Sequence, residues 1–136
     1  MADRDFLKTN FGIEIELTGI TREKAARVVA DHLRGNIERQ NDYYDSYKIT
    51  APDGRDWKIM YDGSLRTQRK VNGQKVAAGR EYSVELVSPI LNYEEDIEDL
   101  QELVRKIRKA GGFSNSTAGI HIHLDGADHT PRSLRN

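Results

Sequence analysis

The chain has 136 residues, with 21 basic and 22 acidic side chains, a formal net charge of −1, 37% hydrophobic residues and no cysteine. This length and composition fit one globular domain, and the balanced charge gives no reason to expect binding to nucleic acid or to an anionic membrane. The absence of cysteine excludes disulfides and thiol chemistry, and with no apolar signal or membrane-spanning stretch we expect a cytoplasmic protein.

The first half of the chain predicts one strand, one helix and two further strands. Residues 10–18 alternate between apolar and polar side chains, which is typical of a half-buried strand. Thr21 is a suitable N-cap for a helix over residues 22–34, whose apolar stripe recurs at helical spacing: Ala25, Ala26, Val29 and Leu33. Residues 47–49 and 57–62 follow as strands, and the second of these alternates as regularly as the first strand of the chain.

A basic hairpin and a further strand are predicted next. Residues 65–80 contain the hairpin signal Asn72-Gly73 and five basic side chains: Arg66, Arg69, Lys70, Lys75 and Arg80. Such a segment is most often a solvated loop, and its functional alternative is a flap whose cations contact phosphates. Residues 81–87 alternate again and predict a strand that ends at Ser88-Pro89.

The last part of the chain predicts its most regular helix and a strand that carries two histidines. Asn92 and Glu95 have the spacing of a capping box, and residues 93–110 combine an apolar stripe with acidic residues in the first turn and basic residues in the last. Residues 119–125 alternate strictly and form the histidine strand. Thr130-Pro131 predicts the cap and first residue of a further helix.

These elements predict an α+β fold, a two-layer sandwich in which two helices cover one face of a mostly antiparallel sheet of four to six strands. The apolar sides of the strands take the helix-covered face. Because side chains alternate along a strand, their polar partners then share the open face: Glu14, Glu16, Glu85, His121 and His123. The sequence therefore predicts an open face that is rich in carboxylates and imidazoles.

Paired carboxylates on one strand point to cation chemistry. Glu14 and Glu16 are two residues apart, so their carboxylates stand about 7 Å apart at the rise of a strand. This spacing suits one cation for each carboxylate or a pair of cations between them, and hard oxygen ligands favour Mg²⁺ or Mn²⁺. The alternative is a solvated strand face on which glutamates pair with lysines across the sheet.

The two histidines of residues 119–125 also allow a functional and a structural interpretation. His121 and His123 project to the same side of their strand, an arrangement that suits a metal ion or a phosphate. Histidines with a purely structural role are also common. Glu85, on a third strand, strengthens the functional interpretation because three separate strands then converge on one face.

Four segments, in this order and rough spacing, resemble the amidoligase family within the carboxylate–amine ligase group that includes glutamine synthetase and γ-glutamylcysteine synthetase. The segments are Phe11-Gly12-Ile13-Glu14-Ile15-Glu16, Trp57 to Asp62-Gly63-Ser64-Leu65, Glu85-Leu86-Val87-Ser88-Pro89-Ile90 and Gly119-Ile120-His121-Ile122-His123. The stretch from His129 to Asn136 is also similar to the segment that follows the histidine strand in that family. The resemblance spans nearly the whole chain and implies a partial glutamine synthetase-like catalytic fold.

The resemblance implies an ATP-dependent ligase that phosphorylates a carboxylate and lets an amine attack the acyl phosphate, with Mg²⁺ or Mn²⁺. By similarity, the metal ligands are Glu14, Glu16, Glu85 and His121, with one cation held by each of the first two. The residues expected at the reacting groups are Glu16 and His123. Those expected to contact the nucleotide are Asp62, Ser64, Ser88 and His123.

Members of that family are usually longer, and the part that follows supplies a further carboxylate ligand and arginines for the phosphates. On this comparison residues 1–136 correspond to the N-terminal half of the catalytic domain, and a C-terminal half or a second copy of the chain would complete the site. The expected partners are small molecules or peptides that bear carboxylate and amine groups. Two alternatives stay open, a non-catalytic binding or assembly module that keeps the fold, and a metal-dependent hydrolase.

Overall fold

The computed structural model describes residues 9–125 and 131–134. Its helices and strands, in chain order, are β1 (Asn10–Leu17), α2 (Arg22–Leu33), β2 (Asn36–Arg39), β3 (Tyr47–Thr50), β4 (Asp56–Met60), β5 (Gln68–Val71), β6 (Gln74–Ala77), the 3₁₀ turn η1 (Arg80–Tyr82), β7 (Val84–Val87), β8 (Leu91–Asn92), α3 (Tyr93–Lys109), β9 (Ile120–Asp125) and β10 (Pro131–Leu134).

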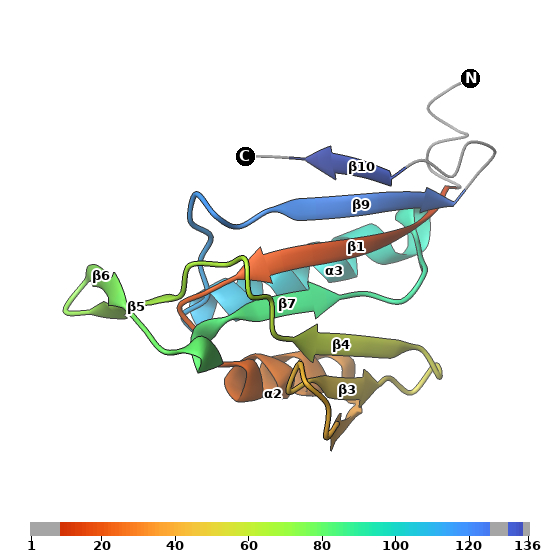
Figure 1. Cartoon of the computed structure of the whole chain (residues 1–136). Coiled ribbons are helices and arrows are strands. Elements are labelled where there is room, and N and C mark those ends of the chain that lie inside the picture. The colour runs from red at the N-terminus through yellow and green to blue at the C-terminus, as the bar shows by residue number, and fades with distance from the viewer. Residues whose placement is uncertain (1–8, 126–130, 135–136) are drawn as a thin grey trace.

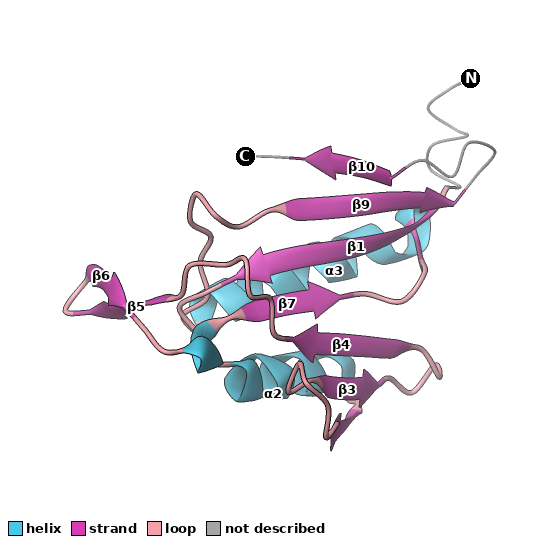
Figure 2. Cartoon of the chain, viewed as in Figure 1, coloured by secondary structure: helices cyan, strands magenta, loops and turns pink. Residues whose placement is uncertain are grey.

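The chain forms two layers, a sheet and a pair of helices packed on one of its faces (Figure 1). The main sheet runs in the order β10-β9-β1-β7-β4-β3-β2, and β8 pairs with the start of β1. Every pairing between these strands is antiparallel. The predicted α+β class is confirmed, and the sheet is wider than expected because short polar strands extend it at both edges. Figure 2 shows both helices on the same side of the sheet.

The core lies between the sheet and the two helices. From the strands it takes alternate side chains, including Ile15 and Leu17 on β1 and Leu86 on β7, which are 5%, 1% and 0% exposed. From α2 and α3 it takes the stripes of apolar residues that face the sheet: Ala25, Ala26, Val29, Leu100, Leu103 and Ile107. Burial of these apolar side chains from water stabilises the layered arrangement. In the described residues, neither helix is long and apolar enough to cross a membrane.

Both helices begin at the predicted caps. The Thr21 side chain accepts a hydrogen bond from the amide of Lys24 at 3.2 Å, and the Asn92 side chain accepts one from the amide of Glu95 at 3.1 Å. The reciprocal bond at the second cap differs from the capping-box expectation. Its acceptor is Asp96, whose Oδ2 accepts from the amide of Asn92 at 2.7 Å and also from Nη1 of Arg55 at 3.0 Å.

Two sequence predictions of secondary structure were wrong. The strand expected over residues 81–87 begins only at Val84, because η1 turns the chain through Arg80–Tyr82. The helix expected from Thr130-Pro131 is contradicted at Pro131, where strand β10 begins; Thr130 and His129 lie outside the described residues. A proline that opens a helix can also open an edge strand, since neither position needs its amide hydrogen, and β10 lies at the edge of the sheet.

A buried arginine joins α2 to η1 and to the loop before β3. The Arg22 side chain is 4% exposed, and its Nη1 donates to the carbonyl of Arg80 at 2.7 Å and to that of Ser83 at 2.9 Å. Its Nη2 donates to Oδ2 of Asp45 at 3.1 Å. These bonds satisfy a buried charge and hold three segments that are not joined by sheet pairing.

Replacing this arginine tests how strongly the fold depends on it. Arg22→Met should lower the free energy of unfolding by about 3 kcal/mol, because two carbonyls and Asp45 lose their donor in a buried place. Arg27→Met is the matched control, since Arg27 is 68% exposed and, among the described residues, forms its ion pair with Glu23 one turn earlier. Urea denaturation of both variants measures their free energy of unfolding. Equal values for the two would contradict the stabilising role given to Arg22.

Candidate metal centre on the open face

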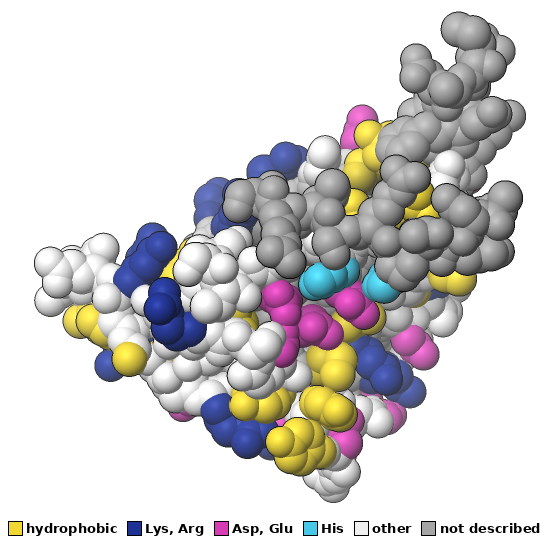
Figure 3. All heavy atoms as spheres, turned by 45° about the horizontal axis from the view of Figure 1, so that its top comes forward, with side chains coloured by type: hydrophobic (Ala, Val, Ile, Leu, Met, Phe, Trp, Pro, Cys, Tyr) yellow, Lys and Arg dark blue, Asp and Glu magenta, His cyan; other side chains and the backbone are white. Residues whose placement is uncertain are grey.

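The register of the sheet gathers the predicted acidic and histidine side chains on its open face. Glu16 on β1 lies directly opposite Glu85 on β7, and Glu14 lies directly opposite His121 on β9. His123 lies opposite Gly12, two pairs further along the same two strands. The predicted sharing of one face is therefore confirmed, and Figure 3 shows the acidic and histidine side chains side by side on it.

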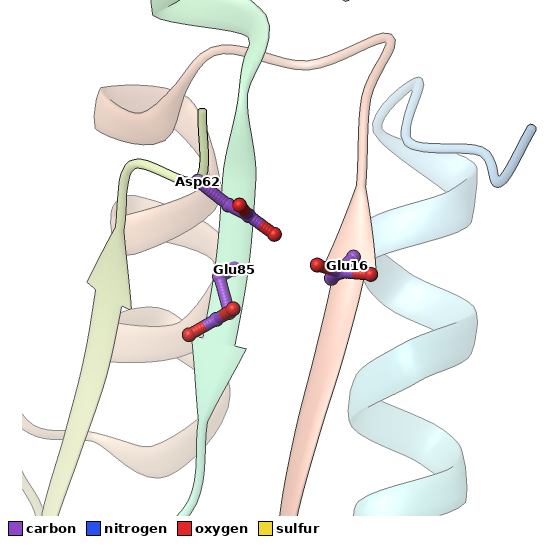
Figure 4. A group of neighbouring side chains, drawn as sticks. All are labelled: Glu16, Asp62 and Glu85. Carbon is purple, nitrogen blue, oxygen red and sulfur yellow. The ribbon is translucent and has the colours of Figure 1, made fainter. Parts of the chain in front are cut away.

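Three carboxyl groups meet at the centre of this face. Glu16, Asp62 and Glu85 each offer an oxygen, and these oxygens all lie within 4.8 Å of one another. Glu16 and Glu85 stand on neighbouring strands, whereas Asp62 follows the end of β4 and extends its carboxylate over β7 toward Glu16 (Figure 4). We call these three residues the acidic triad.

Asp62 lies beyond the last residue of β4, so sheet pairing does not hold it. The fully buried Ser83 does so instead, because its Oγ accepts from the amide of Asp62 at 2.8 Å and donates to the carbonyl of Asp62 at 2.7 Å. Ser64 then orients the carboxylate, since its amide and its hydroxyl donate to Oδ1 of Asp62 at 2.9 and 2.8 Å. Arg22 fixes Ser83 in turn through the carbonyl of Ser83.

Glu16 is held by the loop that enters the histidine strand. The amide of Glu16 donates to the carbonyl of Gly119 at 3.0 Å, and the Glu16 carboxylate is hydrogen bonded to the backbone of Gly119. A methyl group at Gly119 would stand 3.2 Å from Oε1 of Glu16 and 3.6 Å from Nε2 of His121. Glycine at this position therefore leaves room for a carboxylate and an imidazole to approach each other.

Burial and, after it, the charges of neighbouring carboxylates make two members of the triad hard to ionise. Burial, a hydrogen bond with Asp62 and the charge of Asp62 raise the pKa of Glu16 to about 7. Burial and the charges of Glu14 and Asp62 raise the pKa of Glu85 to about 7. Near neutral pH both groups therefore bind protons that glutamates in water would have lost.

Asp62 behaves in the opposite way. Burial disfavours its ionised form, but hydrogen bonds from Glu16 and Ser64 and the charge of His121 together outweigh burial and lower the pKa of Asp62. The two opposite shifts favour a proton on Glu16 and an ionised Asp62 as its hydrogen-bond acceptor. Within residues 9–125, no lysine or arginine forms an ion pair with any member of the triad.

The remaining predicted site residues lie around the triad in different ways. Oε1 of Glu14 is 3.6 Å from Nε2 of His123, so this pair stands beside the triad and outside it. His121 is close enough for its charge to act on Asp62. Ser88 is occupied elsewhere, because its Oγ accepts from the amide of Ile13 at 2.9 Å and donates to the carbonyl of Pro89 at 2.7 Å.

The structure groups Asp62 with Glu16 and Glu85, whereas the sequence suggested a nucleotide contact for Asp62 and put Glu14 in the metal set. The signal for the triad was present in residues 57–62, where Lys58, Met60 and Asp62 alternate against the buried Trp57 and Ile59. Lys58 and Met60 pair with Val87 and Glu85 of β7, so their side chains share the open face with Glu85. By the same alternation, Asp62 is expected on that face. The assignments of individual metal and nucleotide ligands stay predictions.

The donor set of the triad fits a hard divalent cation. Carboxylate oxygens are preferred ligands of Mg²⁺ and Mn²⁺. Since the three carboxyl groups form no ion pair with a lysine or arginine of the described residues, they leave negative charge for a cation to neutralise once they ionise. His121 adds an imidazole at the edge of the group, which Mn²⁺ accepts readily. The same three groups can also hold and release protons near neutral pH.

The raised pKa values predict an unusual dependence of stability on pH. Between about pH 4.5 and 7, Glu16 and Glu85 keep protons in the folded chain that they lose in the unfolded chain, so the free energy of unfolding should fall as pH rises through this window. Glu16→Gln keeps a donor to Asp62 without a titrating group and should flatten this fall. Denaturation in EDTA at several pH values measures the free energy of unfolding of the wild type and of Glu16→Gln. Glu94→Gln, on the exposed side of α3, is the control.

An unchanged slope in Glu16→Gln would contradict the assignment of the shifted pKa to this residue.

Comparison with known proteins identifies the family. The family described as "Putative amidoligase enzyme" matches residues 7–136, which is nearly the whole chain. No curated protein and no solved structure matches the chain. The protein belongs to the amidoligase family.

Proposed function

We propose that this amidoligase-family protein uses ATP and a divalent cation bound at the acidic triad to join a carboxylate to an amine. The observation that carries the proposal is the convergence of Glu16, Asp62 and Glu85 within 4.8 Å on the open face of the sheet. Membership of the family, over residues 7–136, supports a ligase rather than another use of the same groups.

The proposed reaction has two steps. A carboxylate oxygen of the first substrate attacks the γ-phosphorus of ATP, a bond from oxygen to that phosphorus forms, and the bond to the leaving ADP breaks. The nitrogen of the amine then attacks the carbonyl carbon of the acyl phosphate. The carbon–nitrogen bond forms, inorganic phosphate leaves, and the nitrogen loses a proton to a base or to solvent.

The residues of this chain would bind and position the reactants. Glu16, Asp62 and Glu85 would hold the cation, which when bound neutralises the negative charge of the phosphates. Ser83 and Ser64 would keep the Asp62 carboxylate aimed at the other two. His121 and the Glu14–His123 pair border the triad, where imidazoles can donate to phosphate oxygens or take up a proton.

Cation binding is the first test. Mn²⁺ should bind to the chain at pH 8 as measured by isothermal titration, and Glu16→Gln or Glu85→Gln should weaken this binding by at least about tenfold because each removes a charged oxygen ligand. Glu94→Gln, which removes an exposed carboxylate from α3, should leave the affinity unchanged. Absence of Mn²⁺ and Mg²⁺ binding, with or without ATP, would refute the proposed centre.

A second test uses two glycines on the open face. Gly119→Ala should weaken Mn²⁺ binding by about threefold to tenfold, because its methyl group would press on the Glu16 carboxylate at 3.2 Å. Gly12→Ala adds a methyl group to β1, where no atom of the described residues lies within 4 Å of it, and should bind Mn²⁺ normally. Equal affinities of the two variants would show that the triad does not depend on this contact.

The reaction itself distinguishes the three candidate functions. A ligase releases ADP and phosphate only when a carboxylate and an amine are both supplied, whereas a hydrolase releases phosphate or amine from model substrates without ATP. A non-catalytic module shows neither activity, and Glu16→Gln leaves its binding properties unchanged. Release of ADP measured for the whole chain, with panels of amino acids and peptides as substrates, separates these outcomes.

A further inference from the structure

The hairpin β5–β6 carries a concentration of cations that lack acidic partners. Among the described residues, none of its basic side chains or of those that flank it forms an ion pair with a carboxylate: Arg66, Arg69, Lys70, Lys75 and Arg80. The acidic triad nearby likewise has no lysine or arginine partner in that part of the chain. Positive and negative charge are therefore separated on neighbouring parts of one surface, although pairing them would be favourable.

Two of these cations are held in an unfavourable arrangement. Lys70 and Lys75 lie directly opposite each other in the hairpin, and like charges in that relation destabilise a strand pair. Both Nζ atoms lie over the ring of Phe113, at 5.3 and 4.8 Å from its centroid. The ring attracts each cation and keeps the two ammonium groups together. An anion bound between them would remove their repulsion.

The base of the hairpin is fixed to Thr18, the residue that follows β1. Thr18 lies two residues beyond Glu16, and its hydroxyl accepts from the amide of Gln68 at 2.9 Å and donates to the carbonyl of Gln68 at 3.0 Å. Two residues along a strand correspond to about 7 Å, which separates Glu16 from the residue that anchors β5. Figure 3 shows basic side chains between the tip of the hairpin and the acidic side chains.

A second anchor joins the hairpin to the loop that leads to the histidine strand. The amide of Arg66 donates to Oγ1 of Thr117 at 2.9 Å, and Nδ2 of Asn115 donates to the carbonyl of Arg66 at 2.8 Å. The turn is equally defined, because Asn72 and Gly73 have φ of 52° and 79°, the left-handed values of a tight hairpin turn. The hairpin that carries the cations is thus anchored at its base to two other segments and closed by a defined turn.

We propose that the hairpin β5–β6 binds the phosphate chain of a triphosphate whose divalent cation is held by the acidic triad. A triphosphate with a bound cation needs carboxylates on the side of the cation and lysine or arginine on the side of the phosphates, and the two clusters offer these in adjacent places. This inference rests on the proposed function for the binding of the cation. It names Lys70 and Lys75 as the main ligands of the phosphate groups.

The test measures binding of inorganic tripolyphosphate to the whole chain in EDTA, so that the metal centre plays no part. Lys70→Ala/Lys75→Ala should weaken this binding by about tenfold, as expected for the loss of two charged contacts. The two lysines are exposed and their removal relieves a repulsion, so thermal unfolding should show a variant at least as stable as the wild type. The matched control is Lys106→Ala/Lys109→Ala, which removes the same charge from the last turn of α3.

An equal loss in both double variants, or no loss in the hairpin variant, would overturn the proposal. The same measurement with a glutamate-rich peptide of equal charge tests the alternative that the hairpin binds an acidic peptide. Tighter binding of this peptide than of tripolyphosphate, lost in Lys70→Ala/Lys75→Ala, would assign the hairpin to an acidic peptide and also overturn the proposal. Failure of the metal centre is recognised separately, because Glu16→Gln would then leave Mn²⁺ binding unchanged while metal-free tripolyphosphate binding still depends on the hairpin.

Discussion

Antiparallel pairing of β1 with β7 places the side chains of Glu16 and Glu85 directly opposite each other on the open face. At pH values above about 7, where both groups are ionised, like charges in this position oppose folding, and the apolar core on the other face must outweigh them. The same pairing that buries Ile15 against Leu86 brings the two carboxylates together, because side chains alternate along both strands. The site and the core are therefore two consequences of one register.

The third carboxylate depends on a different kind of support. Asp62 follows β4, where sheet pairing has ended, and reaches the triad through its bonds with Ser83, whose carbonyl is in turn bound by the buried Arg22. Buried polar groups of this kind cost free energy unless they are fully hydrogen bonded. Here these bonds also position Asp62, a ligand of the proposed cation. The buried Ser83 and Arg22 therefore hold a carboxylate of the open face in place.

The separation of charge on this surface has a physical meaning in the proposed ligase. Carboxylates that repel one another and lysines that repel one another are both arrangements that a bound metal–triphosphate would relieve. In that case ligand binding would raise the stability of the folded chain, a relation common at functional sites. Amidoligase membership and the convergence of the triad both support the proposed ligase.

The sequence by itself determined the helices, their caps, the alternating strands and the side of each strand that carries Glu14, Glu16, Glu85, His121 and His123, because these follow from local periodicity and capping chemistry. It also carried the motifs of the family. Only the tertiary structure decided that Asp62 joins Glu16 and Glu85 while Glu14 pairs with His123, since strand neighbours and loop ends are set by contacts distant in sequence. For the same reason η1 replaced the start of a predicted strand, and Pro131 opened a strand at the sheet edge instead of a helix.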